Sequence, residues 1–287
     1  MVRYGELLAG LRRELTAAGE PGAELTAREL TAYAAGKTVA ELLRDRSLYV
    51  PVETAEKAER LLREYLAGKP LAYILEEWSF FGLTLKVTPD VLIPRDDTMA
   101  VTTLALEALE GKKGPRVLDL CTGSGCIGIA LASRRKDARV TLADISEAAL
   151  AVAKENVHRH SLESRVNLVS CNALYEAPAF LGSFDLIVSN PPYITGEEMK
   201  ALHTSVADYE PHLALYGGED GLDFYRAVCH NYAAALREGG VLCFEFGLGQ
   251  QDAVGDILRR NSFEDLCFRK DASNIIRAVS ARKKGKE

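Results

Sequence analysis

Residues 116–125 of the chain are Arg-Val-Leu-Asp-Leu-Cys-Thr-Gly-Ser-Gly. Residues 116–120 have the length and apolar character of a buried strand, and the small residues 121–125 are typical of a turn. An apolar stretch over 126–133 follows and has the composition of a helix. Because a strand, a glycine-containing turn and a helix are the repeating unit of alternating α/β proteins, this stretch predicts a domain of that class.

The same alternation continues towards the end of the sequence. Further strands are predicted over 140–143, 166–170, 184–189 and 241–246. Helices are predicted over about 97–110, 222–237 and 250–260, with another that Ser146 caps and that runs to about His158. Two final runs, 263–269 and 274–281, are predicted to complete the sheet as a hairpin.

The first part of the chain has a helical pattern that is often interrupted. Leu7, Leu11 and Leu15 recur at helical spacing before a Pro-Gly break, and further helices are predicted over about 24–35, 38–45 and 53–67. These helices predict a small bundle with nearly balanced charge. Such a domain is suited to binding a partner and carries no cluster of reactive side chains.

A β-branched and aromatic run over 78–87 changes the pattern again, and a glycine near its centre predicts a β-hairpin. Pro94 then precedes the region where the α/β domain begins. The sequence therefore predicts three parts: a helical domain over 1–77, a hairpin linker over 78–95 and an α/β domain over 96–287.

Composition restricts the classes of function. The chain has 287 residues, 47% of them hydrophobic, with a formal net charge of −6 and a pI near 5.6. That charge argues against affinity that comes mainly from neutralising phosphates, although it does not exclude a local basic patch. The six cysteines have no metal-site or disulfide spacing, and neither a signal peptide nor a membrane span is evident. We therefore expect a cytoplasmic protein with reduced thiols and no membrane partner.

The turn at 121–125 has features of a nucleotide site. Gly123 and Gly125 let backbone N–H groups approach a ligand, but the third glycine of a dinucleotide motif and the lysine of a P-loop are missing. Asp144 ends the next strand, where a carboxylate can accept the two hydroxyls of a ribose. Asn172 follows the third strand and is placed to reach an adenine edge, with a simple turn as the alternative. The pattern predicts an adenosine bound without phosphate recognition.

A second polar constellation, Asn190-Pro191-Pro192-Tyr193, follows the strand over 184–189. An Asn side chain supplies an acceptor oxygen, the prolines present carbonyl groups from a fixed backbone, and Tyr193 supplies a flat apolar face. Such a set can accept both hydrogens of a planar NH2 group and stack against its plane. We interpret it as a site that orients an amide or an exocyclic amine.

Adenosine binding beside a site for an NH2 group indicates S-adenosylmethionine as cofactor and methyl transfer as the reaction. We expect Asn190 and the Pro191 carbonyl each to accept one N–H, which favours the pyramidal nitrogen of the transition state. The five histidines have no ligand spacing, so no metal is predicted.

These motifs resemble those of the bacterial peptide chain release factor N5-glutamine methyltransferases. The similarity includes residues 119–125, Asp144, residues 184–194 and residues 217–222, and extends to residues 69–75 and 92–95. It implies a class I methyltransferase domain with a seven-stranded, mostly parallel sheet, joined by a β-hairpin linker to a small N-terminal helical bundle that docks the release factor. The substrate implied is the glutamine of a Gly-Gly-Gln motif. We expect a monomer that requires no direct contact with nucleic acid.

The resemblance also assigns site residues. It implies that Asn190, Pro191 and Tyr193 are the catalytic residues. It also implies that these three residues and Pro192 bind the glutamine amide. The residues assigned to the cofactor are Asp119, Cys121, Thr122, Gly123, Ser124, Gly125, Asp144, Ile145, Asn172, Ala173 and Asn190.

One segment departs from the family pattern. After Ile-Pro-Arg the family usually continues with Pro, an acidic residue, Thr and Glu, whereas this chain has Asp96, Asp97, Thr98 and Met99. Since the segment borders the cofactor pocket in the family, the missing carboxylate at 99 bears on cofactor affinity.

Two alternatives remain open. A DNA or RNA amino-methyltransferase would use Asn190 to Tyr193 for the same physical reason, although this chain lacks an evident base-reading module. The other alternative is a non-catalytic adaptor that binds the cofactor and a translation factor. It is suggested by Met99, which stands where the family usually has Glu.

Overall fold

The computed structural model describes residues 2–285, so the ends of the predicted domains at 1, 286 and 287 lie outside the described residues. The chain divides into two compact units, Met1–Glu77 and Trp78–Glu287. Within residues 2–285, no helix combines the length and the apolar character needed to cross a membrane.

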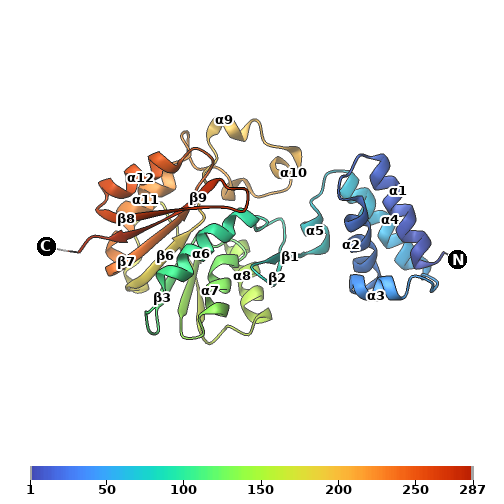
Figure 1. Ribbon diagram of the computed structural model, residues 1–287, viewed down its shortest axis with the longest axis horizontal. Coiled ribbons are helices and arrows are strands. Elements are labelled where there is room, and N and C mark those ends of the chain that lie inside the picture. Colours follow the sequence, from blue (N-terminus) through green and yellow to red (C-terminus); the bar gives the residue numbers. More distant parts are fainter. Residues whose placement is uncertain (1, 286–287) are drawn as a thin grey trace. The chain divides into compact units, whose positions relative to one another are not determined.

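The first unit is a helical bundle (Figure 1). Its helices are α1 (Tyr4–Ala17), α2 (Ala23–Ala35), α3 (Val39–Arg44), α4 (Val52–Leu66) and α5 (Leu71–Leu75). Leu11 and Leu15 of α1 pack with Leu30 of α2 and Leu62 of α4 in one apolar core. The core side chains recur three or four residues apart, so the helical spacing of the leucines is what closes this bundle.

The structure confirms the predicted hairpin as β1 (Glu77–Phe80), which starts at the last residue of the first unit, and β2 (Leu83–Lys86). Phe81 and Gly82 connect the strands with φ values of 51° and 78°. Two consecutive residues with positive φ form a turn whose twist matches that of the flanking strands, which explains the glycine in the run.

A seven-stranded sheet forms the centre of the second unit, as predicted (Figure 1). Its strands are β3 (Arg116–Leu120), β4 (Arg139–Asp144), β5 (Val166–Ser170), β6 (Phe184–Ser189), β7 (Leu236–Glu245), β8 (Phe263–Lys270) and β9 (Ile276–Lys283). The order across the sheet is β5-β4-β3-β6-β7-β9-β8. The first five strands are parallel, and β9 is antiparallel to both β7 and β8.

Helices cover the sheet and create two separate cores. The longer helices are α6 (Met99–Ala108), α7 (Cys126–Arg134), α8 (Glu147–Arg159), α11 (Asp223–Asn231) and α12 (Gln251–Arg260). Shorter elements are η1 (Asp96–Thr98), η2 (Ala179–Leu181), α9 (Gly196–Met199), α10 (Thr204–Ala207), η3 (His212–Ala214) and η4 (Ala233–Ala235). Val117 enters one core and Leu118 the other, because successive side chains of a strand point to opposite faces.

One predicted boundary is wrong. The helix expected over 222–237 ends at Asn231, and β7 already begins at Leu236. The reason is tertiary: Leu236 pairs with Phe184 of β6, and the register shifts before the next pair, Leu186 with Val241. Sheet pairing therefore recruits residues whose local composition also suits a helix.

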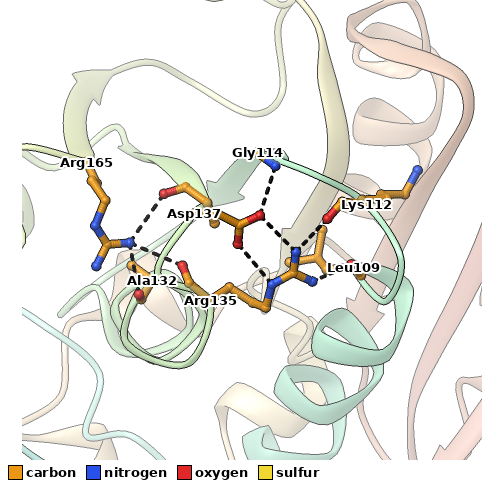
Figure 2. Close-up of polar contacts among 8 residues, drawn as sticks. Leu109, Lys112, Gly114, Ala132, Arg135, Asp137 and Arg165 are labelled. Atoms are coloured by element: carbon orange, nitrogen blue, oxygen red, sulfur yellow. Dashed lines mark hydrogen bonds and ion pairs between the residues drawn. The ribbon is translucent and has the colours of Figure 1, made fainter.

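Two arginine side chains stabilise the loops at the amino ends of the strands by donating hydrogen bonds to backbone carbonyl groups (Figure 2). Arg165 donates through Nη1 to the carbonyl oxygens of Ala132, Arg135 and Ala138, at 3.1, 3.2 and 3.4 Å. Arg135 donates to the carbonyl oxygens of Leu109 and Lys112, and its guanidinium also pairs with Asp137, as Figure 2 shows. Carbonyl groups in the last turn of α7 and in the loops that follow α6 and α7 are thus satisfied by cationic side chains.

We predict that Arg165→Met lowers the free energy of unfolding by about 1–3 kcal/mol, because it removes the donor to three carbonyl oxygens while keeping a long apolar side chain. Denaturant unfolding of the variant measures this. Arg139→Met is the matched control, since Arg139 is exposed at the start of β4. Equal stability of the two variants would contradict the role given to Arg165.

Candidate active site

A cavity of about 150 Å³ opens at the carboxyl ends of β3, β4, β5 and β6. All of its lining residues belong to the second unit. Strand β3 has β4 as its neighbour on one side and β6 as its neighbour on the other, so the strand order changes direction at β3. Open α/β sheets bind ligands at such a switch point, so the position of the cavity follows from the strand order.

The turn between β3 and α7 forms one wall of this cavity. Cys121, Gly123 and Gly125 have φ values of 57°, 53° and 82°. A Cβ atom at Gly125 would lie 2.9 Å from Ile129 Cδ1 and 3.1 Å from Leu142 Cδ1. Glycine is required at 125 both by the backbone conformation and by this close packing.

Asp119 holds the turn from within. Its Oδ2 atom accepts from Thr122 Oγ1 at 2.7 Å and from the backbone N–H of Gly128 at 2.9 Å. Its Oδ1 atom is buried without a hydrogen-bond partner, and burial raises the pKa of the carboxyl group to about 7. Asp119 does not line the cavity, so its contribution to the site is the conformation of the turn.

Asp144 connects the turn to the end of β4. Its Oδ2 atom accepts from the backbone N–H of Gly123 at 2.9 Å, and its Oδ1 atom accepts from that of Ser146 at 3.0 Å. Burial raises the pKa of this carboxyl group, and the two backbone N–H groups oppose the rise. Each carboxylate oxygen can accept more than one hydrogen bond, so Asp144 can still bind hydroxyl groups from the cavity that it lines.

The other predicted cofactor residues lie around the same opening. Asn172 lines it and accepts from the backbone N–H of Leu174 through Oδ1 at 2.9 Å, which leaves the Nδ2 group available to a ligand. The structure places these predicted residues in the cavity wall: Cys121, Thr122, Gly123, Ser124, Asp144, Ile145, Asn172, Ala173, Asn190 and Pro192. Asp119, Gly125, Pro191 and Tyr193 are not among the residues that line it.

The segment Asn190 to Tyr193 follows β6 and is fixed from two sides. Gly217 packs so closely against it that a Cβ atom there would lie 2.6 Å from both Pro192 O and Tyr193 Cα. Gln250 Nε2 donates to Tyr193 O at 3.0 Å. The Asn190 side chain donates through Nδ2 to Thr98 Oγ1 at 3.3 Å, which leaves Oδ1 as its remaining acceptor.

Residues that the sequence analysis did not assign also shape the site. Thr98 and Arg95 line the cavity, and Arg95 forms an ion pair with the buried Glu210. Glu210 Oε2 also accepts from the backbone N–H of Ile93 at 3.3 Å. Since Pro211 lines the cavity too, Glu210 joins two of its walls; the arginine in Ile-Pro-Arg was the sequence signal for this contact.

Glu245 is a further residue that the sequence analysis did not assign. It ends β7, is 1% exposed, and has a pKa raised to about 7 by burial. A carboxylate at the end of an apolar strand was the available signal. Met99 begins α6 and packs against an apolar core, so the side chain at the position where the sequence departs from the family that it resembles serves packing. Among residues 2–285, no group of three or more potential metal ligands gathers in one place.

The chain is similar to known proteins along most of its length. The description "Methyltransferase small domain" matches residues 95–219, and "PrmC N-terminal domain" matches residues 6–75. A release factor glutamine methyltransferase of Clostridium acetobutylicum is 39% identical over 248 residues, which are 84% of this chain and 87% of the relative. One from Cereibacter sphaeroides is 37% identical over 281 residues, which are 98% of this chain and 99% of the relative.

Among solved structures, a methyltransferase from Pyrococcus furiosus matches with a TM-score of 0.52 and 17% identity, covering 79% of this chain and 100% of its own. At that identity the likeness concerns the fold, which is that of a methyltransferase.

The buried Asp119 predicts a pH dependence of stability. Its pKa is raised in the folded state, so its contribution to stability is fully present below the unfolded value near 3.8 and is lost as pH rises through about 7. We expect Asp119→Asn to gain about 2–4 kcal/mol relative to the wild type between pH 4 and pH 8.

Denaturant unfolding at both pH values measures the difference between the two proteins. Asp208→Asn, at an exposed position, is the matched control. A constant difference between wild type and Asp119→Asn across this range would contradict a buried carboxyl group that titrates near 7.

Proposed function

The chain belongs to the release factor glutamine methyltransferase family, and from this premise we propose that it transfers a methyl group from S-adenosylmethionine to the side-chain amide nitrogen of the Gly-Gly-Gln glutamine of a peptide chain release factor. The observation that carries the proposal is the position of Asn190 in the wall of the cavity that Asp144 and Asn172 also line. A site for an adenosine and a site for an amide thus share one opening.

The donor set of the cavity fits S-adenosylmethionine. Asp144 offers a carboxylate to hydroxyl groups, Asn172 offers Nδ2 to a ring nitrogen, and Ile145 and Ala173 supply apolar surface for a flat base. The cofactor supplies an electrophilic methyl group on a sulfonium centre. The turn at 121–125 has no lysine and no third glycine, which suits a ligand without phosphates.

Asn190 and Pro191 orient the glutamine amide in this proposal. An amide nitrogen is a weak nucleophile because its lone pair is delocalised into the carbonyl group. Acceptors at Asn190 Oδ1 and at the Pro191 carbonyl bind the two N–H groups and favour the pyramidal nitrogen that carries the lone pair. The half-buried Tyr193 packs against the plane of the amide, and the carbonyl of Pro192 completes the segment.

A methylated amide nitrogen is a strong acid, so water removes its proton and no side chain has to act as a base. The site residues accordingly serve to orient the amide and to exclude solvent.

We also propose roles for the helical unit and the linker. The helical unit docks the release factor, and the segment 78–95, which contains most of the hairpin, acts as the linker to the methyltransferase domain. The enzyme works as a monomer in the cytoplasm, where release factors act, and needs no nucleic acid.

Asp144→Asn tests the cofactor site. The change removes one carboxylate oxygen at the cavity, and we expect the dissociation constant of S-adenosylmethionine to rise about 10-fold or more. Isothermal titration calorimetry measures this, with Asp256→Asn on the exposed face of α12 as control. Unchanged affinity in Asp144→Asn would exclude the ribose role.

Asn190→Ala tests the reaction itself. We expect the wild type to transfer labelled methyl to a release factor, and the variant to be slower by about 100-fold or more, because one of the two acceptors is lost. Cofactor affinity should stay nearly unchanged, since Asp144 and Asn172 remain. Asn167→Ala, at an exposed position of β5, is the control. A normal rate in Asn190→Ala would rule out this mechanism.

A further inference from the structure

Asn190 can serve as an acceptor only in one of its two carboxamide orientations. A rotation of 180° about the last bond of the side chain exchanges Oδ1 and Nδ2. The flipped side chain would present N–H donors to the substrate amide, whose own N–H groups need acceptors. Something in the protein must therefore select the orientation. The hydrogen bond from Nδ2 to Thr98 Oγ1, 3.3 Å long, is the first part of that selection.

Thr98 alone cannot select it, because a hydroxyl group can accept or donate. Thr98 is 1% exposed, so water does not decide its direction. Its hydroxyl proton has a partner in the carboxyl group of Glu245, to which Thr98 and Asn190 both form side-chain hydrogen bonds. If Glu245 is ionised it can only accept, so Thr98 must donate to it and is left to accept from Asn190.

The strand register explains why Glu245 lies at this place. Ser189 of β6 pairs with Phe244 of β7, so the next residues of the two parallel strands, Asn190 and Glu245, emerge side by side. Glu245 is 1% exposed, and its Oε2 atom has no hydrogen-bond partner in the described structure. A buried carboxyl group with an unsatisfied oxygen is costly, and the fold gains no second ion pair or cap from that atom.

We propose that Glu245 is a positioning residue for methyl transfer, which, as a carboxylate, holds Asn190 both directly and through Thr98 in the orientation that presents Oδ1 to the substrate amide. This inference rests on the proposed function and adds a residue to its machinery. A neutral side chain at 245 can donate to Thr98, which reverses the hydroxyl and allows Asn190 to flip.

The surroundings of the Glu245 carboxyl group determine its pKa. Burial raises its pKa to about 7, the nearby Asp97 raises it too, and Arg277 lowers it. Tyr193, Tyr225 and Cys126 also face this carboxyl group, and burial raises the pKa of each, so they stay neutral. Since only the carboxylate selects the orientation, kcat should rise as pH increases through about 7.

Glu245→Gln is the direct test, with release factor as substrate. We expect kcat to fall at least tenfold, with the KM of the release factor and the affinity for S-adenosylmethionine unchanged. The variant should also lose the rise of kcat between pH 6 and pH 8. Glu238→Gln, an exposed position on the same strand, is the matched control and should behave as the wild type.

Thr98→Val interrupts the same connection in its middle. We expect it to lower kcat less than Glu245→Gln does, because the direct contact of Glu245 with Asn190 remains. The double variant should be no slower than Glu245→Gln, because Thr98 acts only through the orientation that Glu245 sets. Multiplied effects in the double variant would overturn the proposal. So would a loss of cofactor binding or a lower unfolding midpoint in Glu245→Gln, since these indicate a purely structural role.

A spectroscopic measurement keeps the inference separate from the proposed function. In ¹H–¹⁵N spectra, the side-chain amide signal of Asn190, identified by its absence in Asn190→Ala, should shift with pH around 7 in the wild type and stay constant in Glu245→Gln. A wild type inactive on release factors but showing this shift would refute the proposed function alone. An Asn190 signal insensitive to pH, or a Glu245→Gln enzyme of normal kcat, would refute the role of Glu245.

Discussion

The parallel pairing of β3 with β4 on one side and with β6 on the other is the constraint from which the site follows. Val117 pairs with Val140 across one edge and with Leu186 across the other. Parallel strands end at the same edge of a sheet, so the turn after β3, Asp144 after β4 and Asn190 after β6 all reach one opening. Residues far apart in sequence thereby become neighbours, and the hydrogen bond from Gly123 to Asp144 adds a specific contact between two of them.

The buried polar groups at that edge have different consequences for stability and function. Asp119 and Glu245 are both at most 1% exposed, and burial raises the pKa of both to about 7. Each has one buried oxygen without a hydrogen-bond partner, and the other oxygen of Asp119 fixes the turn through two hydrogen bonds. Apolar residues at these positions would cost the fold less, so each carboxyl group is best understood through what it orients: a backbone turn in one case and a side-chain amide in the other.

Much of this arrangement was predictable from sequence because it depends on local patterns. The apolar runs and the glycine-containing turns predicted the strands and their order along the chain. The residues at the ends of those strands were predicted to be Asp144, Asn172 and Asn190 of the site. The end of α11 was not predictable, since the pairing of Leu236 with Phe184 is a long-range contact. Thr98 and Glu245 were missed for the same reason: they come from η1 and β7, and only the folded sheet brings them to Asn190.

Product analysis by mass spectrometry tests the central claim most directly. A release factor and a sample of bulk nucleic acid are incubated together with the protein and S-adenosylmethionine, and the products are separated and digested. The account predicts one added methyl group, about 14 Da, on the Gly-Gly-Gln peptide, located on the glutamine side chain, and unmodified nucleic acid. Methylated adenine or guanine with an unmodified release factor would contradict it, and so would cofactor binding without a methylated product.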